Sequence, residues 1–184
     1  MNYSRVRIET PRLILRPFTP EDADSWFAIM RDPLVMQYWG HGPWLDISQA
    51  REAIADDIEA METGEYLKLA ICEKSQAECL GMCIFFHHHY GSQRGAIGYC
   101  LAPEAQGRGY MTEALRYFFT FLHQRMSLRR LEADIHPDNL ASARVLERLG
   151  FQREGLMKER WCVDGVISDS VLFGLLLNKP SWSP

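Results

Sequence analysis

A short glycine-containing turn is the segment of the sequence best suited to bind an anion. The stretch Gln106-Gly-Arg-Gly-Tyr-Met-Thr-Glu-Ala114 follows an apolar, β-prone segment and opens a helical pattern of apolar residues. The backbone N–H groups of such a turn, together with the positive end of the helix, favour a phosphate-bearing ligand. The turn is not a P-loop, which requires Gly-Lys-Ser/Thr, and it is not a dinucleotide fingerprint, which requires a third glycine where Thr112 stands. Taken alone, the glycines are explained equally well as residues of a tight turn.

Polar residues also open the next predicted helix along the chain. Asn139 and Ser142 stand at its start, Leu146 lies in its apolar stripe, and Gly150 ends it. In isolation, Asn139 is a helix cap and Ser142 is a solvated residue of the first turn. Only in combination with the glycine-containing turn do these residues indicate a binding site.

Three consecutive histidines, His87, His88 and His89, could in principle bind a metal. On a strand, only His87 and His89 share a face, and two ligands do not form a zinc site without a third from elsewhere. We therefore expect no metal, and we place these residues at a strand end that faces either solvent or a substrate cleft.

The hydrophobic pattern around these segments predicts an α/β protein with a mixed sheet. A polar turn between two β-prone stretches predicts an antiparallel hairpin, and Asp164-Gly165 predicts a second hairpin near the C-terminus. The expected helices cover residues 23–30, 47–61, 111–122 and 140–149. The expected strands cover residues 13–16, 66–72, 79–88, 96–101, 131–135, 161–163 and 171–177, and residues 32–43 are expected to form a loop.

Length and composition favour a single domain. The 184 residues are 47% hydrophobic and 24% charged, which allows a sizeable core without disulfides or a structural metal. The formal net charge is −4 and the basic residues are scattered, so we expect no binding to duplex nucleic acid. No apolar segment is typical of a secretion signal or a membrane span. Together with an odd number of cysteines, five, this predicts a cytoplasmic protein with reduced thiols.

The charge is unevenly distributed along the chain. Acidic residues outnumber basic ones in residues 1–70, whereas the remainder is close to neutral. Asp56, Asp57 and Glu59 belong to this acidic part and lie on the second predicted helix. They form either an ordinary solvated face or a surface that attracts a protonated amine or basic peptide.

Taken together, the two polar segments resemble the acetyl-coenzyme-A motifs of the GNAT N-acetyltransferase superfamily. Further segments resemble its RimJ/RimL-like branch, which acetylates ribosomal-protein N-termini: Glu9–Pro17, Gly98-Tyr99, Glu154-Gly155, Asp164-Gly165 and Asp169. The resemblance implies a single N-acetyltransferase domain over residues 1–184. It also implies a mixed, mostly antiparallel central sheet with splayed middle strands and flanking helices.

The resemblance implies an acetyl-CoA site. The strand at residues 99–102 would pair with the pantetheine arm and supply a backbone N–H to the oxyanion. The amides of residues 107–111 would hold the pyrophosphate, Arg108 would add positive charge, and Asn139 would bond the pantetheine arm. The expected cofactor-binding residues are Tyr99, Cys100, Leu101, Ala102, Gln106, Gly107, Arg108, Gly109, Tyr110, Met111, Asn139 and Ser142.

The implied reaction is direct attack of an amine on the thioester, followed by protonation of the leaving thiolate. The tyrosine that commonly supplies this proton is replaced by Leu146, and Ser142 is the expected donor, as proposed for the RimL-like branch. Carboxylates expected for the base are replaced by Ala96 and Trp161. The remaining candidates for the base are Glu159, Asp134 and His136. A weak base favours an α-amine, whose pKa is about 7.7–8.0, over lysine at about 10.4.

The acceptor is less well specified than the donor. By resemblance, Tyr38, Trp39 and Trp44 line an acceptor pocket or else pack their loop onto the core, and His87 faces the same cleft or solvent. The leading hypothesis is acetylation of a ribosomal-protein N-terminal alanine. The alternatives are a small amine, such as a polyamine, an aminoglycoside or an amino acid, and a coenzyme-A-binding module without catalysis. Both a monomer and a homodimer are compatible with the sequence.

Overall fold

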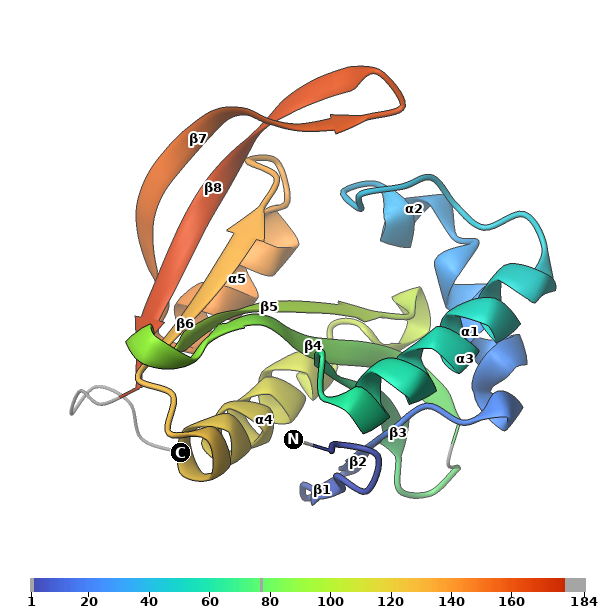
Figure 1. Cartoon of the computed structure of the whole chain (residues 1–184). Coiled ribbons are helices and arrows are strands. Elements are labelled where there is room, and N and C mark those ends of the chain that lie inside the picture. The colour runs from blue at the N-terminus through green and yellow to red at the C-terminus, as the bar shows by residue number, and fades with distance from the viewer. Residues whose placement is uncertain (1, 77, 178–184) are drawn as a thin grey trace.

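One twisted sheet runs through the molecule, with α1 and α3 against one face and α4 against the other (Figure 1). The computed structural model describes residues 2–76 and 78–177. The strands pair in the order β1-β2-β3-β4-β5-β6-β8-β7. They are β1 (Ile8–Glu9), β2 (Leu13–Arg16), β3 (Leu67–Glu73), β4 (Cys79–His89), β5 (Arg94–Leu101), β6 (Arg130–Ile135), β7 (Gln152–Val163) and β8 (Val166–Leu176). The α-helices are α1 (Ala23–Met30), α2 (Pro33–Met36), α3 (Ile47–Thr63), α4 (Tyr110–Met126) and α5 (Leu140–Arg148).

The expectation of one domain over residues 1–184 stays a prediction, and residues 1, 77 and 178–184 lie outside the described part of the chain. Within residues 2–76 and 78–177, no helix combines the length and apolar content needed to cross a membrane.

Local side chains and backbone fix the helix ends. Asp46 caps α3, and its own backbone N–H donates to the Gln49 side chain at 3.1 Å. Gly64 ends this helix in a left-handed conformation, with φ 81°, as the sequence pattern predicts. At α5, the Asn139 side chain accepts a hydrogen bond from Ser142 N at 3.1 Å. The predicted cap at Asn139 is therefore confirmed.

The middle strands β5 and β6 separate after a short stretch of pairing. All neighbouring strands are antiparallel except these two, which are parallel where Arg94–Ala96 lies opposite Arg130–Glu132. Beyond Ala96, residues 97–101 of β5 face a gap on the β6 side. This confirms the expected mixed, mostly antiparallel sheet with splayed middle strands.

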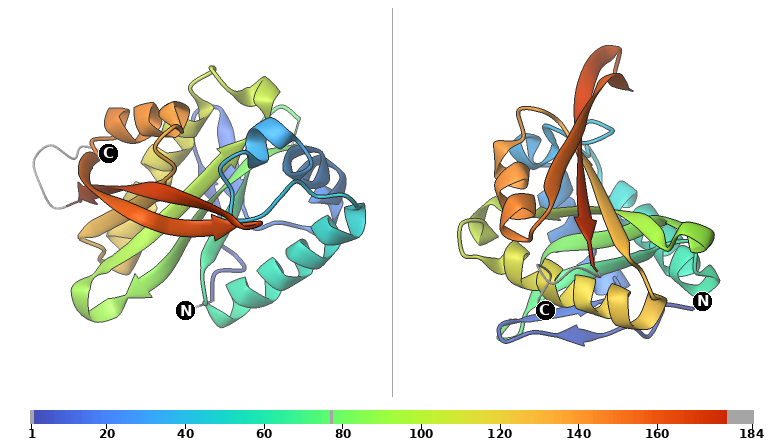
Figure 2. Two further views of the ribbon diagram at one scale, coloured as in Figure 1. Left: turned by 90° about the horizontal axis from the view of Figure 1, so that it is seen from above. Right: turned by 90° about the vertical axis from the view of Figure 1, so that its left-hand side faces the viewer.

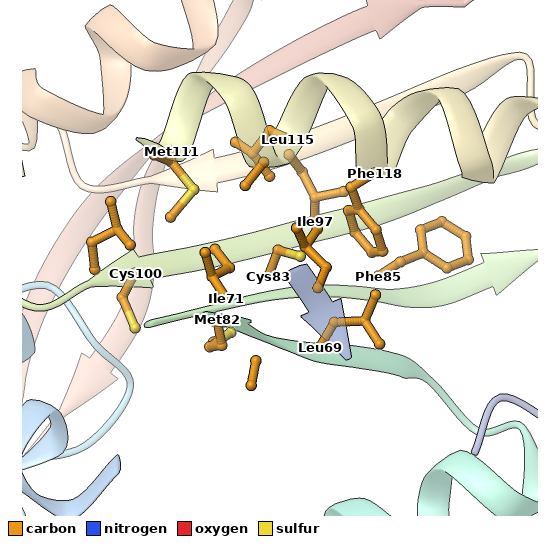
Figure 3. Close-up of a cluster of buried hydrophobic side chains, with 14 of the residues drawn as sticks. Leu69, Ile71, Met82, Cys83, Phe85, Ile97, Cys100, Met111, Leu115 and Phe118 are labelled. Atoms are coloured by element: carbon orange, nitrogen blue, oxygen red, sulfur yellow. The ribbon is translucent and has the colours of Figure 1, made fainter. Parts of the chain in front are cut away.

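Apolar packing holds α4 beside that gap. Met111, Leu115 and Phe118 of α4 lie over Ile97 of β5 and Phe85 of β4 (Figure 3), and all five side chains are buried. Burial of each such side chain contributes about 1.5–3 kcal/mol. The packing places the N-terminus of α4 next to the open end of β5.

Three elements differ from the sequence prediction. The short edge strand β1 is not among the expected strands. The expected loop at residues 32–43 contains the short helix α2, because Asp32 accepts a hydrogen bond from Leu34 N at 2.7 Å and Pro33 occupies the first helical position. The C-terminal hairpin is longer than expected, since β7 is exposed along most of its length and lacks the alternation that marks a strand. Its turn, Asp164-Gly165, lies where predicted, with positive φ at both residues.

The thiols are free, as expected for reduced cysteines. Cys72, Cys79, Cys83 and Cys100 are buried, and Cys162 is exposed. Burial raises the pKa of the Cys100 thiol to about 12, so this thiol stays protonated and unreactive at neutral pH.

Of the two interpretations of the acidic residues of α3, an acceptor-facing surface is not supported by their positions. Asp57 is 5% exposed, and its carboxylate accepts hydrogen bonds from Lys68 Nζ at 2.6 Å and the Tyr66 hydroxyl at 2.7 Å. Asp56 and Glu59 are exposed, but no described residue of α3 lines the cleft between β5 and β6. The hypothesis is wrong for Asp57 because that carboxylate is an internal ion-pair partner, and nothing in the geometry supports it for the other two.

Loss of Asp57 is expected to destabilise the fold. Asp57→Ala leaves the Lys68 ammonium buried without its counter-ion, which costs about 3–5 kcal/mol. Asp56→Ala, one position earlier and exposed, is the matched control and changes stability by about 0.5 kcal/mol or less. Urea denaturation of both variants measures the difference, and equal stabilities would contradict the internal role of Asp57.

Candidate active site

A cleft of about 980 Å³ fills the gap between β5 and β6. It extends to the loop after α2 and to the β7–β8 hairpin, which reaches toward that loop when seen from above (Figure 2). A Cβ added at Gly42 in the loop would lie 3.8 Å from Asp164 Oδ2 in the hairpin turn. The predicted site residues that line the cleft are Tyr38, Trp39, Tyr99, Cys100, Leu101, Gln106, Gly107, Gly109, Tyr110, Met111, His136, Asn139 and Ser142. The fold thus gathers segments that are far apart in the sequence.

The open edge of β5 directs backbone groups into the cleft. Ala102 N donates to Leu80 O of the neighbouring chain segment at 2.8 Å. Because N–H groups alternate in direction along an antiparallel strand, those of Leu101 and Tyr99 point the other way, into the gap. Gln106 Nε2 donates to Leu101 O at 3.1 Å on this same side. The predicted role of the strand's amides therefore fits Tyr99 and Leu101, whereas the amide of Ala102 is already used within the sheet.

The glycine-containing turn joins this edge to α4. Gly107 and Gly109 have φ of 72° and 77°, and a Cβ added at Gly107 would meet nothing within 4 Å. Glycine is therefore required at residue 107 by the left-handed backbone and not by crowding. Tyr110 begins α4, so the unpaired N–H groups of the first helical turn face the end of the cleft.

Arg12 from the N-terminal segment holds this turn from outside. Its Nε donates to Glu113 Oε2 at 2.7 Å, and its Nη1 donates to the backbone oxygen of Arg108 at 3.0 Å. The guanidinium groups of Arg12 and Arg108 each lie 4.5 Å from the centre of the Tyr110 ring. The side chain of Arg108 therefore lies against the Tyr110 ring, and Arg108 is not among the residues that line the cleft. The sequence pattern singles out both the segment around Arg12 and the glycine-containing turn, but nothing in it indicates that Arg12 and Glu113 are in contact.

Glu113 is a partly buried carboxylate in the centre of this contact. Burial alone would raise its pKa, but hydrogen bonds from the Thr10 hydroxyl at 2.6 Å and from Arg12 outweigh burial and hold the pKa below its ordinary value. The ionised form is therefore the one that the folded protein stabilises.

A pair of hydroxyl groups lies on the α5 side of the cleft. The Tyr99 hydroxyl and Ser142 Oγ are 2.7 Å apart, and the Tyr99 hydroxyl also donates to Ser142 O at 3.3 Å. Burial raises the pKa of Tyr99, and its hydrogen bond to Ser142 offsets part of that rise. Leu146 is fully buried. The tyrosine hydroxyl in this region therefore comes from Tyr99 of β5 and not from position 146 of α5. The sequence did not indicate that Tyr99 would hydrogen bond Ser142.

Two of the predicted candidates for the base line the cleft. Asp134 accepts hydrogen bonds from Trp161 Nε1 at 3.3 Å and from Arg160 Nε at 3.4 Å. His136 Nδ1 accepts a hydrogen bond from Asp138 N at 3.1 Å. A neutral His136 therefore carries its proton on Nε2, where it can donate but cannot accept.

Three other predicted residues lie outside the cleft. Trp44 packs edge-on against the buried Trp26, with ring centres 6.0 Å apart, so the alternative of core packing holds for it. His87 is exposed in an irregular part of β4, with φ 52°. Glu159 is also exposed at a register shift, and its backbone N–H donates to Asp169 at 2.9 Å. Irregular pairing in these two strands turns His87 and Glu159 away from the cleft, and the alternation of apolar and polar residues in the sequence does not indicate it.

The consecutive histidines are not joined by further ligands. Among the described residues, no three His, Cys, Asp or Glu side chains are grouped closely enough to hold a metal ion.

Neutralising Glu113 is expected to lower stability in a pH-dependent way. Glu113→Gln loses hydrogen bonds to a charged group and costs about 1.5–3 kcal/mol at pH 7. Because the folded state lowers the pKa of Glu113, this stabilisation is complete above the ordinary value of about 4.3 and is lost as pH falls through the folded-state pKa. The difference in stability between wild type and variant should therefore be smaller at pH 3 than at pH 7. Denaturation at both pH values measures it, and Glu104→Gln, at an exposed position, is the control. A stability difference that does not shrink in acid would contradict it.

Comparisons with known proteins identify the family. Residues 12–152 match a family model described as an acetyltransferase (GNAT) domain. The N-acetyltransferase p20 of Bacillus licheniformis is 33% identical over 167 residues, covering 91% of this chain and 94% of the relative. The [ribosomal protein uS5]-alanine N-acetyltransferase of Escherichia coli is 27% identical over 199 aligned positions, covering 100% and 96%. The fold also matches RimL, a ribosomal L7/L12 α-N-protein acetyltransferase solved with coenzyme A, with a TM-score of 0.82 at 22% identity over 93% and 98%. The chain belongs to the GNAT acetyltransferase family and is an N-acetyltransferase.

Proposed function

We propose that this enzyme transfers the acetyl group of acetyl-CoA to the N-terminal α-amine of a protein, and that a ribosomal protein beginning with alanine is its acceptor. The observation that carries the proposal is the gap between β5 and β6. It combines the free N–H groups of Tyr99 and Leu101, the helix start at Tyr110 and the hydroxyl of Ser142 in one cleft. The free thiols suit the cytoplasm, where we propose that the enzyme acts.

The donor would bind along the open edge of β5. The N–H groups of Tyr99 and Leu101 can hydrogen bond an extended amide-containing arm in place of a strand partner. The turn at residues 107–109 and the first turn of α4 would hold the pyrophosphate through backbone N–H groups. Arg144 and Arg148 of α5 also line the cleft and add positive charge to the donor side. The residues present therefore fit acetyl-CoA without a metal ligand set.

Catalysis needs a donor for the developing oxyanion and a proton for the leaving thiolate. A backbone N–H of β5 can stabilise the oxyanion, a contact worth about 2.7–4 kcal/mol when preorganised. We assign the proton to Ser142. Tyr99 positions the Ser142 hydroxyl at 2.7 Å and can return a proton to it after the transfer.

Substitution of the hydroxyl pair tests these roles. Ser142→Ala is expected to lower kcat on the order of 10²-fold, the lower end for general acid catalysis, because a thiolate is a good leaving group. Tyr99→Phe acts only through Ser142 and is expected to lower kcat less, with the KM for the amine unchanged. Steady-state release of free thiol measures both. Full activity of Ser142→Ala would remove Ser142 from the mechanism.

The choice of a protein acceptor rests on relatives. A relative that aligns over the whole chain is named as an alanine N-acetyltransferase of the ribosomal protein uS5. The contrary observation is that the loop after α2 closes toward the other wall, since the Tyr38 hydroxyl donates to Asp138 O at 3.3 Å and Gly42 lies close to Asp164. These contacts narrow the acceptor end of the cleft, which favours a small amine as the second candidate acceptor.

An acceptor screen separates the candidates. Purified protein is first titrated with acetyl-CoA by calorimetry, and binding is expected. Thiol release is then followed with a ribosomal-protein peptide that begins with alanine, the same peptide with an acetylated N-terminus, a polyamine, an aminoglycoside and free amino acids. Turnover with only the free peptide supports the proposal, and turnover with only a small amine replaces it. Binding without turnover on any acceptor would indicate a non-catalytic module, and absence of binding would overturn the function altogether.

A further inference from the structure

The cleft contains few groups that could accept a proton from the amine. Positions 96 and 161, where the family resemblance implies a carboxylate, hold alanine and tryptophan. Among the described residues that line the cleft, the carboxylates are Asp134 and Asp164. Asp164 lies in the exposed turn of the β7–β8 hairpin, whereas Asp134 lies on β6, the strand that separates from β5. Asp134 is therefore the carboxylate on the wall of the gap itself.

Both oxygens of Asp134 are fixed by neighbours on β7. Trp161 reaches past β8 and donates from Nε1 to Oδ1 at 3.3 Å, and Arg160 donates from Nε to Oδ2 at 3.4 Å. The Asp134 side chain is still 24% exposed. The residue that replaces the expected carboxylate at position 161 thus orients another carboxylate on the same wall.

The other titratable groups near this wall are less suitable. Glu132, which lies opposite Ala96, is bound by Arg94 at 2.9 Å and Arg130 at 2.8 Å and does not line the cleft. A neutral His136 carries a proton on Nε2, because Nδ1 is an acceptor. His41 has the opposite tautomer, since Nδ1 lies 2.8 Å from Gly42 O and must donate to it, but this residue is exposed on the loop after α2.

Charged side chains from several elements line the cleft. Arg144 and Arg148 of α5 are positive and Asp134 and Asp164 are negative, while Arg160, which does not line the cleft, pairs with Asp134 at 3.4 Å. A protonated amine is attracted to the carboxylates and repelled by the arginines. Asp134 would hold the incoming nitrogen by a charge-assisted hydrogen bond.

We propose that Asp134 is the catalytic base of this enzyme and that Trp161 is its positioning residue. The inference rests on the proposed acetyl transfer. The bound ammonium first loses one proton to solvent, and the lone pair of the neutral amine then forms the C–N bond with the thioester carbon. The nitrogen, now positively charged again, loses its second proton to Asp134. The C–S bond breaks as the carbonyl re-forms, and the thiolate takes a proton from Ser142. Solvent then removes the proton from Asp134. Tyr99 returns a proton to Ser142 and is itself reprotonated by solvent, so the overall products are the amide and the free thiol.

The test compares substitutions that preserve shape. Asp134→Asn is expected to lower kcat by 10²–10³-fold with the acceptor that the screen identifies, while the Kd for acetyl-CoA stays unchanged by calorimetry. The rates of wild type and variant should both rise between pH 7 and pH 9, because an α-amine with a pKa of about 7.7–8.0 becomes neutral over this range, while the deficit persists because Asp134 acts on the proton that the nitrogen carries after attack. Asp134→Glu should restore part of the rate. Trp161→Phe, which keeps a ring but lacks the N–H, should lower kcat several-fold with acetyl-CoA binding unchanged.

Two controls separate the outcomes. Glu147→Gln removes an exposed carboxylate of α5 outside the cleft and should leave all parameters unchanged. His41→Asn tests the competing base. If the wild type is active and Asp134→Asn is equally active, the role of Asp134 is overturned while the acetyl transfer stands. The same conclusion follows if His41→Asn lowers kcat more than Asp134→Asn does. Wild-type protein that binds acetyl-CoA but transfers to no acceptor overturns the proposed function instead, and the role of Asp134 with it.

Discussion

The separation of β5 and β6 is the constraint on which the site depends. Each of these strands follows its antiparallel partner, β5 along β4 as far as Leu101 and β6 along β8 as far as Ile135. The parallel pairing between them is weaker and shorter, and it ends at Ala96. Backbone N–H groups left without a partner are costly to bury. The edge of β5 therefore has N–H groups without partners in the sheet, and a ligand with amide groups of its own can accept hydrogen bonds from them.

The N-terminal segment contributes to this site although it is far from it in sequence. Thr10 and Arg12 lie between β1 and β2, at the edge of the sheet, yet both bind Glu113 in the first turn of α4. The carboxylate is stabilised by these contacts and by the positive helix end. The same Arg12 also binds the backbone oxygen of Arg108 inside the turn. The turn that would hold the pyrophosphate is thus fixed on its outer side by the start of the chain.

Local signals in the sequence predict most of the helices and strands, although the cap at Asp32 that begins α2 is itself a local signal and was missed. Long-range contacts account for the contacts in the site that the sequence did not indicate. The caps and turns at Gly64, Asn139 and Asp164-Gly165 follow from side-chain and backbone preferences within a few residues. The hydrogen bond between Tyr99 and Ser142 joins residues from a strand and a helix, and only the tertiary fold brings them together.

The same distinction explains where the structure places other predicted residues. Trp44 was compatible with a pocket or with the core, and its contact with Trp26, which no local pattern encodes, placed it in the core. The expected positions of His87 and Glu159 assumed regular alternation along a strand. Irregular pairing in β4 and β7 breaks that alternation and moves both side chains away from the cleft.

One short connection sets the distance between the proposed base and the proposed acid. Asp134 lies near the end of β6 and Ser142 lies in the first turn of α5, and the loop between them is held by internal hydrogen bonds. Asn139 N donates to His136 O at 2.9 Å, and Asp138 N donates to His136 Nδ1 at 3.1 Å. Tyr38 stacks on the His136 ring, with ring centres 4.9 Å apart. His136 therefore uses its acceptor nitrogen to hold this connection, which leaves a neutral imidazole with only a donor, Nε2, for other partners.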